Sequence, residues 1–462
     1  MTDEFDVIVI GAGPPGENAA GRAVENGLSA AIVEERLVGG ECSFWGCIPS
    51  KTLIRPGDVI AAAKRVPGAA EAVTGSIDVR AALAQRDYMT SSWDDHTQTP
   101  WLDQMGIELV RGHGRLAGAR TVEVATADGA RRLTARRAVV LANGTTPFMP
   151  PIDGLSDAGA WSNREATEVK AIPRRFLVLG GGPIGVELAQ AFRRLGSDEV
   201  TVIEGGPRLL GRDEPFAGEA VRAAFEAEGI AVVLGHSVTA AHRQGDGPVS
   251  VTLDDDREFE GDEILVAVGR RANTHDVGLE SVGLDPDQRL SVDRLLRIQG
   301  VDGGWLYAVG DISGLALLTH MGKYQGRLVG DVIAGKDVED VADLKAIPRV
   351  TFTDPQVAAV GPTEQEARDA GIDVRAVQYD MGGVSGAYTR GNGISGTCQL
   401  LVDQSKRVVI GATFTGPDVQ EVLHSATIAI VGEVPLERLW HAVPAFPTVS
   451  EIWLRFLEAY GM

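Results

Sequence analysis

The fold of the first third of this 462-residue chain is decided by the stretch Asp6-Val7-Ile8-Val9-Ile10-Gly11-Ala12-Gly13-Pro14-Pro15-Gly16. An apolar strand leads into a glycine loop and a helix-like run over 17–25, and a second strand, 30–33, ends in Glu34. In a parallel βαβ unit such glycines permit a tight turn, close approach to a pyrophosphate and close helix packing. The helix N-terminus favours phosphate charge, and the strand-end carboxylate can bind ribose hydroxyls. We therefore predict a dinucleotide site at Gly11, Gly13, Gly16 and Glu34.

The same plan recurs in the middle of the chain. The apolar strand 176–179 precedes Gly180-Gly181-Gly182-Pro183-Ile184-Gly185, a helix-like run through Arg194 follows, and the strand 200–203 ends in Glu204. One G-x-G-x-x-G loop is a weak signal, because chance matches and structural turns produce it too. Two copies in full βαβ context indicate two nucleotide sites. The second site is expected at Gly180, Gly182, Gly185 and Glu204.

Two of the three cysteines, Cys42 and Cys47, directly follow the first unit. On a straight helix, residues five apart differ by about 7.5 Å along the axis, beyond the reach of a disulfide. A bonded pair therefore needs a distorted turn, which Gly46 and Pro49 can supply. A cysteine pair beside a dinucleotide fold in a cysteine-poor chain indicates a redox dithiol, and the alternative is two unrelated buried thiols. The third cysteine, Cys398, is interpreted as a packed side chain in a strand.

The formal net charge of -21 disfavours nucleic acid and anionic membrane surfaces as partners. Solubility is the simpler explanation of this acidity. No apolar run approaches the roughly 20 residues that span a bilayer, and the acidic start at residues 1–6 passes straight into a strand. We expect a cytoplasmic protein without nucleic-acid or membrane partners, and we predict no metal site.

Composition shifts indicate four segments. A buried-strand pattern over 139–142 leads to Gly144 and a Pro/Gly-rich connection over 147–154, which suits a domain boundary. The second unit closes with a buried-strand pattern over 263–270 that contains Gly269. The expected segments are 1–150, 151–272, 273–344 and 345–462.

Two later regions complete the expected architecture. The apolar strand at 305–309 delivers Gly310 and Asp311 to its C-terminal end, where ligands bind in open α/β sheets. From about 345 onward, strand patterns alternate with helix-like stretches and no nucleotide motif is present. The predicted strands are 396–402 and 408–414, and the predicted helices are 419–431 and 450–460. We predict an α/β fold with two Rossmann-like dinucleotide-binding domains and a C-terminal α+β domain for assembly.

These motifs together resemble the flavin-dependent pyridine nucleotide-disulfide oxidoreductases, and among them the dihydrolipoamide dehydrogenases most closely. Segments 317–323 and 352–361 are also similar to family segments, so the resemblance covers essentially the whole chain. It implies an FAD domain, an NAD domain and a C-terminal dimerisation domain that completes the site of the other subunit in a homodimer. The first loop, Glu34 and Asp311 would bind FAD, and the second loop would bind the nicotinamide nucleotide. Gly144, Gly269 and Gly310 are expected in cofactor-binding turns.

The choice of nicotinamide nucleotide is read from the end of the second βαβ unit. Glu204 favours NADH, because a carboxylate there accepts a hydrogen bond from a 2′-OH and repels a 2′-phosphate. Arg208 and Arg212 lie downstream and leave NADPH open.

The resemblance also implies a path for electrons. Lys51 and Glu187 match a family pair near the flavin N5 and the nicotinamide, and burial of such charges is costly unless they pair. The alternative is two independent surface charges. Hydride would pass from NADH to FAD, and the flavin would then reduce the disulfide. Cys47 would be the thiol nearest the flavin, and Cys42 would exchange with the substrate as a thiolate.

The sequence departs from the family at its acid/base residue. The family has a His in a His-Pro-Thr-x-x-Glu segment, and here that position holds Phe446. A positioned general acid/base contributes typically 10²–10⁴-fold, so reduction of an ordinary disulfide such as lipoamide is expected to be poor. His441 is a candidate substitute, and its alternative role is packing or capping. Glu451 keeps its place but has lost the His that it would orient.

The surroundings of the dithiol differ as well. Glu41 stands where relatives carry a small hydroxyl residue, and its carboxylate should raise the pKa of the Cys42 thiol. Phe44 and Trp45 replace a smaller pair and should change the shape of the pocket. These changes favour an unusual oxidant. Asn143 stands where the family usually has Thr, in a loop that is expected to face the flavin, and we expect this substitution to be tolerated.

Three functions stay open from the sequence. The preferred one is an FAD enzyme that passes electrons from NADH through the Cys42/Cys47 dithiol to a disulfide or another two-electron acceptor. The second is a reductase of quinones, metal ions or dyes that needs no His. The third is a flavin-bound redox sensor. The sequence identifies neither the physiological acceptor, nor the proton donor, nor the pathway.

Overall fold

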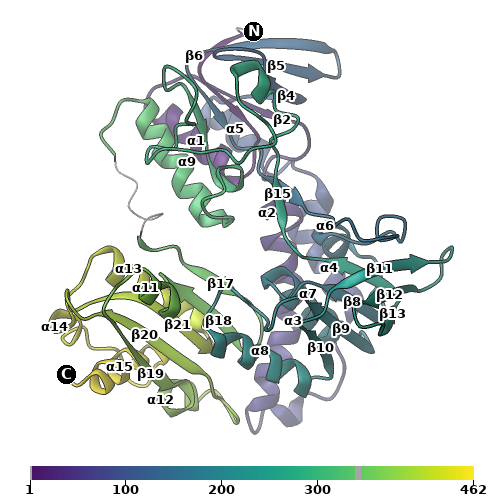
Figure 1. Ribbon diagram of the computed structural model, residues 1–462, viewed down its shortest axis with the longest axis vertical. Coiled ribbons are helices and arrows are strands. Elements are labelled where there is room, and N and C mark those ends of the chain that lie inside the picture. The colour runs from purple at the N-terminus through teal and green to yellow at the C-terminus, as the bar shows by residue number, and fades with distance from the viewer. Residues whose placement is uncertain (1–2, 339–344) are drawn as a thin grey trace. The chain divides into compact units, whose positions relative to one another are not determined.

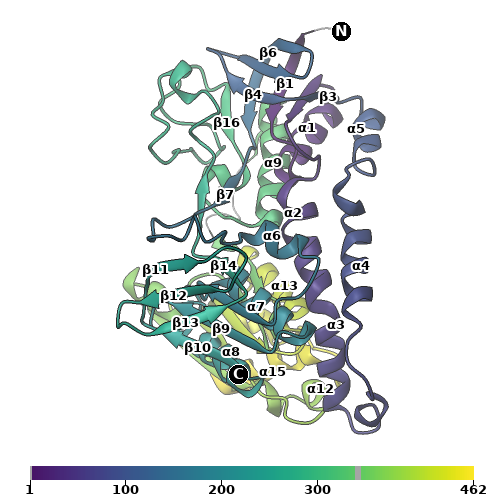
Figure 2. The ribbon, with the colours of Figure 1, turned by 90° about the vertical axis from the view of Figure 1, so that its right-hand side faces the viewer.

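The structure is a computed structural model that describes residues 3–338 and 345–462 (Figures 1 and 2). The chain forms two compact units, of which the first contains Met1–Pro49, Asp87–Pro147 and Gly269–Asp343. The second contains Ser50–Arg86, Phe148–Val268 and Leu344–Met462. Residues 1, 2 and 339–344, which belong to the predicted segments 1–150 and 273–344, lie outside the described residues.

The first unit is built on a seven-stranded sheet with the order β3-β2-β1-β6-β5-β4, and β16 pairs with β6. β1 is parallel to β2 and β6, whereas β4 and β5 extend the sheet in antiparallel fashion. Val7 and Val9 of β1 enter one apolar core and Ile8 and Ile10 the other, so burial of both faces explains the unbroken apolar run. The strands are β1 (Glu4–Ile10), β2 (Ala30–Glu34), β3 (Glu108–Arg111), β4 (His113–Leu116), β5 (Thr121–Thr126), β6 (Gly129–Leu141) and β16 (Leu306–Ala308).

Helices α1 (Pro14–Glu25) and α9 (Thr319–Ile333) lie side by side in the first unit (Figures 1 and 2). Their backbones approach closely, since a Cβ placed on Gly326 would lie 2.3 Å from the carbonyl oxygen of Pro15. The short elements of this unit are α2 (Gly40–Phe44), α5 (Thr99–Met105) and the antiparallel pair β7 (Thr145–Pro147) and β15 (Arg270–Ala272). Helix α3 (Cys47–Arg65) starts in the first unit and continues in the second.

The second unit contains a parallel sheet with the order β10-β9-β8-β14 and a three-stranded antiparallel sheet, β11-β12-β13. Phe176 and Val178 of β8 pack with residues of α7 and α8, whereas Leu177 and Leu179 pack with residues of β12. Helix α4 (Val79–Met89) begins in this unit and ends in the first. The other elements are α6 (Asn163–Glu168), β8 (Arg175–Leu179), α7 (Pro183–Leu195), β9 (Glu199–Glu204), α8 (Pro215–Ala227), β10 (Ile230–Leu234), β11 (Val238–Arg243), β12 (Val249–Leu253), β13 (Glu258–Gly261) and β14 (Glu263–Val266).

The rest of the second unit is a five-stranded antiparallel sheet, β17-β18-β21-β20-β19, with α13 and α15 packed on its core. The predicted strands and helices of this region are confirmed, as is the α/β fold class. Cys398 is fully buried in β20, which confirms its packing role, and burial raises its pKa to about 12. The elements are β17 (Arg349–Thr351), β18 (Gln356–Val360), α11 (Glu364–Asp369), β19 (Val374–Asp380), α12 (Ser385–Tyr388), β20 (Thr397–Asp403), β21 (Val408–Gly416), α13 (Val419–Val431), α14 (Leu436–Leu439) and α15 (Ile452–Tyr460).

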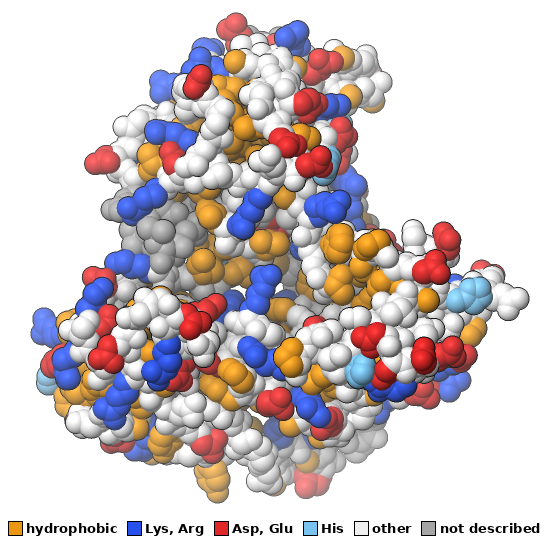
Figure 3. Space-filling view, in the orientation of Figure 1, with side chains coloured by type: hydrophobic (Ala, Val, Ile, Leu, Met, Phe, Trp, Pro, Cys, Tyr) orange, Lys and Arg blue, Asp and Glu red, His pale blue; other side chains and the backbone are white. Residues whose placement is uncertain are grey.

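Charged side chains of both signs are interspersed over the face drawn in Figure 3. Among the described residues, no helix combines the length and the apolar character that crossing a membrane requires.

Candidate active site

The first and third glycines of each loop are required by the packing of the chain itself. A Cβ on Gly16 would lie 2.0 Å from the carbonyl oxygen of Gly11, and a Cβ on Gly185 would lie 2.0 Å from that of Gly180. Gly11 and Gly180 have φ angles of 102° and 111°, in the left-handed region that favours glycine. These four residues therefore form the tight turn and bring helix and strand together.

The middle glycines differ, because nothing in the chain excludes a side chain from them. A Cβ on Gly13 would meet no atom closer than 3.8 Å, and a Cβ on Gly182 would meet none within 4 Å. Each stands as N-cap directly before a helix that begins with proline. The space that they leave lies where a pyrophosphate approaches the helix N-terminus. The two loops therefore fit dinucleotides.

Glu34 is fixed at the end of β2 in the first unit. Its carboxylate accepts hydrogen bonds from the backbone N–H of Ala12, at 2.8 Å, and of Arg36, at 2.7 Å. Burial raises its pKa, and the two hydrogen bonds act in the opposite direction. The carboxylate is thus held rigidly beside the glycine loop, with lone pairs left for ribose hydroxyls.

Glu204 has the matching arrangement at the end of β9. It accepts hydrogen bonds from the N–H of Gly181, at 2.6 Å, and of Gly206, at 2.7 Å. Arg208, the nearest downstream cation, donates to the carbonyl oxygens of Gly211, at 2.9 Å, and Asp213, at 3.3 Å. One guanidinium nitrogen, Nη2, makes both hydrogen bonds, and the buried Nε has no hydrogen-bond partner among the described residues.

Asp311 belongs to a polar network within the first unit. Its Oδ2 accepts a hydrogen bond from the Thr145 hydroxyl at 2.9 Å, and Arg270 donates to that hydroxyl at 2.7 Å. Arg270 also lies 3.5 Å from a carboxylate oxygen of Glu41. Burial raises the pKa of Asp311, although Thr145 and Arg270 act against it. The predicted site residues Gly144, Gly269 and Gly310 flank this network and have positive φ angles.

Asn143 offers a second test of fit for a bound cofactor. Its Nδ2 donates to the carbonyl oxygen of Asn273 at 2.7 Å, and Asn273 returns a hydrogen bond of 2.7 Å to the carbonyl of Asn143. Among the described residues, the buried Oδ1 of Asn143 has no hydrogen-bond partner. A buried acceptor without a partner is costly. Asn143 is therefore suited to accept a hydrogen bond from a ligand beside Asp311.

The two cysteines occupy separate helices. Cys42 lies in α2, and Cys47 begins α3, so the chain breaks its helix at Trp45 and Gly46. The distorted turn expected from the five-residue spacing is thus present. Both thiols are half-buried, and the Cys47 Sγ lies 3.3 Å from the hydroxyl oxygen of Thr319.

The dithiol segment packs directly on the first glycine loop. Gly39 donates its N–H to the carbonyl oxygen of Ala12 at 2.8 Å, and a Cβ on Gly40 would lie 2.8 Å from the Cα of Gly13. Both glycines have positive φ angles. A nucleotide bound at Gly13 therefore starts beside the segment that carries the cysteines.

Lys51 and Glu187 form an ion pair within the second unit. The Lys51 ammonium lies 2.6 Å from Glu187 Oε2, and the Glu187 side chain is only 5% exposed. The other Glu187 oxygen accepts a hydrogen bond of 2.9 Å from the N–H of Phe352, and the ammonium lies 4.7 Å from the centre of the Phe352 ring. The alternative of two independent surface charges is excluded.

Comparisons with known proteins decide the family. Residues 5–326 match the family described as pyridine nucleotide-disulphide oxidoreductase, and residues 347–455 match its dimerisation domain. The chain belongs to the pyridine nucleotide-disulphide oxidoreductases. It is therefore an enzyme of a family that uses FAD and NAD(P)H, and its dimerisation domain indicates a homodimer.

Curated relatives of this oxidoreductase include mercuric reductases and dihydrolipoyl dehydrogenases. It is 31% identical to the mercuric reductase of Lysinibacillus sphaericus, over 97% of this chain and 81% of the relative. It is 33% identical to the dihydrolipoyl dehydrogenase of Thermus scotoductus, over 98% of this chain and 97% of the relative. Among solved structures, LpdA from Mycobacterium tuberculosis has a TM-score of 0.86 at 25% identity, over 99% of this chain and 100% of that one. The flavoprotein disulfide reductase RclA from Escherichia coli shares the fold, with a TM-score of 0.87 over 99% of each chain at 23% identity.

The C-terminal segment of this oxidoreductase carries the predicted acid/base region in the second unit. Phe446 is 73% exposed, and His441 is exposed in the turn after α14. Glu451 is buried and pairs with Arg455 one helical turn later. Its Oε2 has no hydrogen-bond partner among the described residues. Arg455 therefore engages the carboxylate that was expected to have lost its partner, and a role for His441 stays a prediction.

Sequence reasoning missed three neighbours of the site. Thr319 beside Cys47 and Phe352 beside Lys51 lie in segments noted only for their family likeness. Arg270 follows the predicted Gly269 directly but was not singled out. The likeness of these segments was the available signal, since their contacts join residues far apart in the chain.

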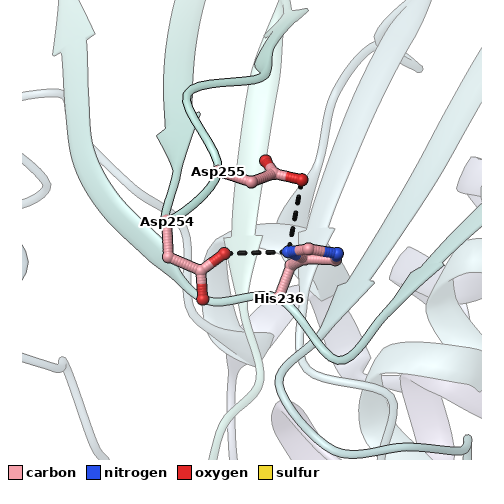
Figure 4. A group of neighbouring side chains, drawn as sticks. All are labelled: His236, Asp254 and Asp255. Atoms are coloured by element: carbon pink, nitrogen blue, oxygen red, sulfur yellow. Dashed lines mark hydrogen bonds and ion pairs between the residues drawn. The ribbon is translucent and has the colours of Figure 1, made fainter.

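One group in the described part of the chain has metal-like geometry, His236 with Asp254 and Asp255 on the second unit (Figure 4). The His236 Nδ1 lies 2.9 Å from Asp254 and 3.4 Å from Asp255. Asp255 also pairs with Arg257 at 2.7 Å. Ion pairing accounts for this exposed group, and we assign no metal to it.

Proposed function

We propose that this protein is an NADH-dependent FAD oxidoreductase that delivers electrons through Cys42 and Cys47 to a two-electron acceptor. The observation that carries the proposal is the packing of the dithiol segment on the first glycine loop, where Gly40 touches Gly13. A flavin nucleotide that starts at this loop has the dithiol beside its path. Asp311 and the unpartnered Oδ1 of Asn143 supply further polar contacts in the same unit.

Bound FAD supplies the carrier that accepts a hydride and releases two electrons. The chain provides the groups that receive and pass them on. Cys47 is the thiol on the flavin side, and the Thr319 hydroxyl can donate a hydrogen bond that stabilises its thiolate. Cys42 exchanges with the acceptor. Lys51 and Glu187 hold a compensated pair of charges, so the ammonium can polarise the flavin without an uncompensated buried charge.

NADH is the proposed donor, because Glu204 stands where the ribose 2′-OH would bind and would repel a 2′-phosphate, and the Nη2 of Arg208 donates to two backbone oxygens. We expect kcat/KM for NADH to exceed that for NADPH by at least about tenfold, which is about 1.4 kcal/mol. Glu204→Gln should reduce this preference. Arg208→Gln is the control, and a loss of NADPH activity in it would identify Arg208 as the phosphate ligand instead.

The proposed experiment is an anaerobic titration with NADH followed by a panel of acceptors. A long-wavelength absorbance band from thiolate to flavin is expected on reduction. No band and no difference between the parent and a Cys42→Ser, Cys47→Ser double variant would contradict the role of the dithiol. Steady NADH consumption with any acceptor would contradict the redox-sensor alternative.

A reductase of quinones, metal ions or dyes is the second candidate. Phe446 in place of the family His favours it, as does the likeness to mercuric reductases. Rapid quinone turnover by the double serine variant would establish electron exit without the dithiol. Phe446→His should raise activity with lipoamide if the missing acid limits that reaction, and unchanged activity would mean that the shape of the pocket limits it.

A further inference from the structure

Helix α3 carries a charged stripe that faces helix α7. Lys51, Asp58 and Arg65 are seven residues apart, which places them on one face of the helix. Lys51 pairs with Glu187 at 2.6 Å, and Asp58 pairs with Arg194 at 3.2 Å. All of these residues belong to the second unit. Two ion pairs therefore join α3 to α7, one with its cation on α3 and the other with its cation on α7.

Helix α7 also binds the turn that leads into β18. Glu187 accepts the N–H of Phe352 at 2.9 Å. Gln190 accepts the N–H of Asp354 at 2.8 Å and donates to its carbonyl oxygen at 3.0 Å. Arg194 donates to the Asp354 carboxylate at 2.8 Å. These helix residues are three and four positions apart, so they lie on one face of α7, and each of them binds a residue of the turn.

The Asp354 carboxylate is the point where both helices meet the turn. Its Oδ2 accepts hydrogen bonds from Arg194 of α7 and from Arg65 of α3, and its side chain is 19% exposed. Burial opposes ionisation, yet Arg194 and Arg65 lower the pKa of Asp354 below its ordinary value. The carboxylate is therefore a charged bridge between α3, α7 and the turn.

We propose that Asp354 is a positioning residue for the Lys51–Glu187 pair. Phe352, two residues before it, contacts both members of that pair, through its N–H and through its ring. Holding the turn at Asp354 fixes these contacts and the register of α3 against α7. The inference rests on the proposed function in one respect, that the Lys51 and Glu187 charges act on the flavin.

The test is a double-mutant cycle on the midpoint potential of the bound flavin, measured by chemical reductive titration without NADH or an acceptor. Glu187→Gln leaves the Lys51 ammonium less compensated, so reduced flavin should be favoured by about tenfold, or about 30 mV for a two-electron couple. Asp354→Asn should shift the potential in the same direction, so that the equilibrium between oxidised and reduced flavin favours the reduced form by about threefold. In the Glu187→Gln background, Asp354→Asn should add nothing, because residues that act through one another are not additive.

Two outcomes overturn the inference. One is an unchanged potential in Asp354→Asn while Glu187→Gln shifts it, and the other is an equal shift from Asp354→Asn in both backgrounds. An unchanged potential in Glu187→Gln contradicts instead the flavin role given to the pair in the proposed function, and the inference falls with it. Failure to use NADH or any acceptor contradicts only the proposed function, since neither enters the titration.

A matched control and a milder variant keep the test decisive. Glu263→Gln removes a carboxylate that pairs with Arg243 at 2.7 Å in the same unit, away from the stripe, and should leave the potential unchanged. If Asp354→Asn fails to fold, Arg65→Gln removes only the α3 contact of the bridge. It should produce a smaller shift of the same sign, and an unchanged potential there contradicts the proposal.

Discussion

The two βαβ units have nearly identical loops, yet the helices that follow these loops contact different kinds of segments. In both, the strand before the loop is buried on both faces, and the Glu at the end of the next strand accepts two backbone N–H groups. Helix α1 then packs closely on α9, where glycines such as Gly326 bring the backbones together. Helix α7 carries polar side chains that bind two separate segments, α3 and the turn before β18. The motif therefore sets the glycine turn and the strand-end carboxylate, and residues beyond it set what the helix connects.

Corresponding positions make the difference specific. Counted from the third glycine of each loop, Glu187 corresponds to Asn18 and Arg194 to Glu25. Asn18 donates to the carbonyl of Pro14 in its own helix at 2.8 Å, and Glu25 pairs with Arg22 of the same helix. Asn18 also accepts a hydrogen bond of 3.0 Å from Arg327 of α9, and Arg22 pairs with Asp331 of α9 at 2.8 Å. The polar side chains of α1 therefore reach one neighbouring helix, whereas those of α7 reach both α3 and the turn before β18.

The largest expected effect comes from the glycines that both units need for packing. Gly16→Ala and Gly185→Ala each place a Cβ 2.0 Å from a backbone oxygen. Because backbone atoms cannot move aside as a side chain does, we expect the free energy of unfolding to fall by at least about 3 kcal/mol, or the variant not to fold. Thermal unfolding measures this loss of stability. Gly75→Ala is the control, since a Cβ on Gly75 meets nothing within 4 Å. A parent-like melting temperature in Gly185→Ala would break the comparison.

The residue after the third glycine should give a pH-dependent effect in one unit alone. It is Glu17 in α1 and the buried Val186 in α7. The pKa of Glu17 is raised from 4.5 to about 7, chiefly by burial, and within that net shift Lys323 acts to lower it and Glu34 to raise it. A raised folded pKa means that its stabilising contribution is complete below about pH 4.5 and is lost as the pH rises through 7.

Glu17→Gln removes that loss. The variant should therefore gain stability relative to the parent between pH 5 and 8.5, by up to about 3 kcal/mol. Urea midpoints of both proteins at the two pH values measure it, with Glu25→Gln as control for a carboxylate lost from the same helix. A difference between variant and parent that is the same at both pH values would contradict the prediction.

Substitutions at the middle glycines should have the smallest effect on folding. Each should weaken the binding of one nucleotide and leave the other unaffected. Gly13→Ala and Gly182→Ala add a Cβ that meets no chain atom closer than 3.8 Å. Both variants should fold, but the methyl group takes the space of the pyrophosphate, so affinity should fall by about tenfold or more. Gly13→Ala should lose FAD, whereas Gly182→Ala should keep FAD and show a raised KM for NADH. Loss of FAD from Gly182→Ala would show that the two sites are not independent.

Much of the site was predictable because its chemistry is local in the chain. The glycine loops, the strand-end carboxylates Glu34 and Glu204 and the break between Cys42 and Cys47 follow from residues a few positions apart, whose geometry is fixed by backbone sterics. The helix at Val419–Val431 appeared with the predicted bounds, since its apolar pattern repeats at helical spacing. The pairing of Lys51 with Glu187 was implied only by family resemblance.

The sequence by itself determined the two glycine loops, the Cys42/Cys47 segment with its helix break and the α/β class, because each is encoded in contiguous residues. Only the tertiary structure decided that Thr319 lies beside Cys47, that Arg270 joins Glu41 to Thr145, and that Asp354 bridges Arg65 and Arg194. Each of these contacts joins residues more than 100 positions apart. No local periodicity encodes such pairs, since they form only when packing of the core brings the segments together and burial makes their charges depend on one another.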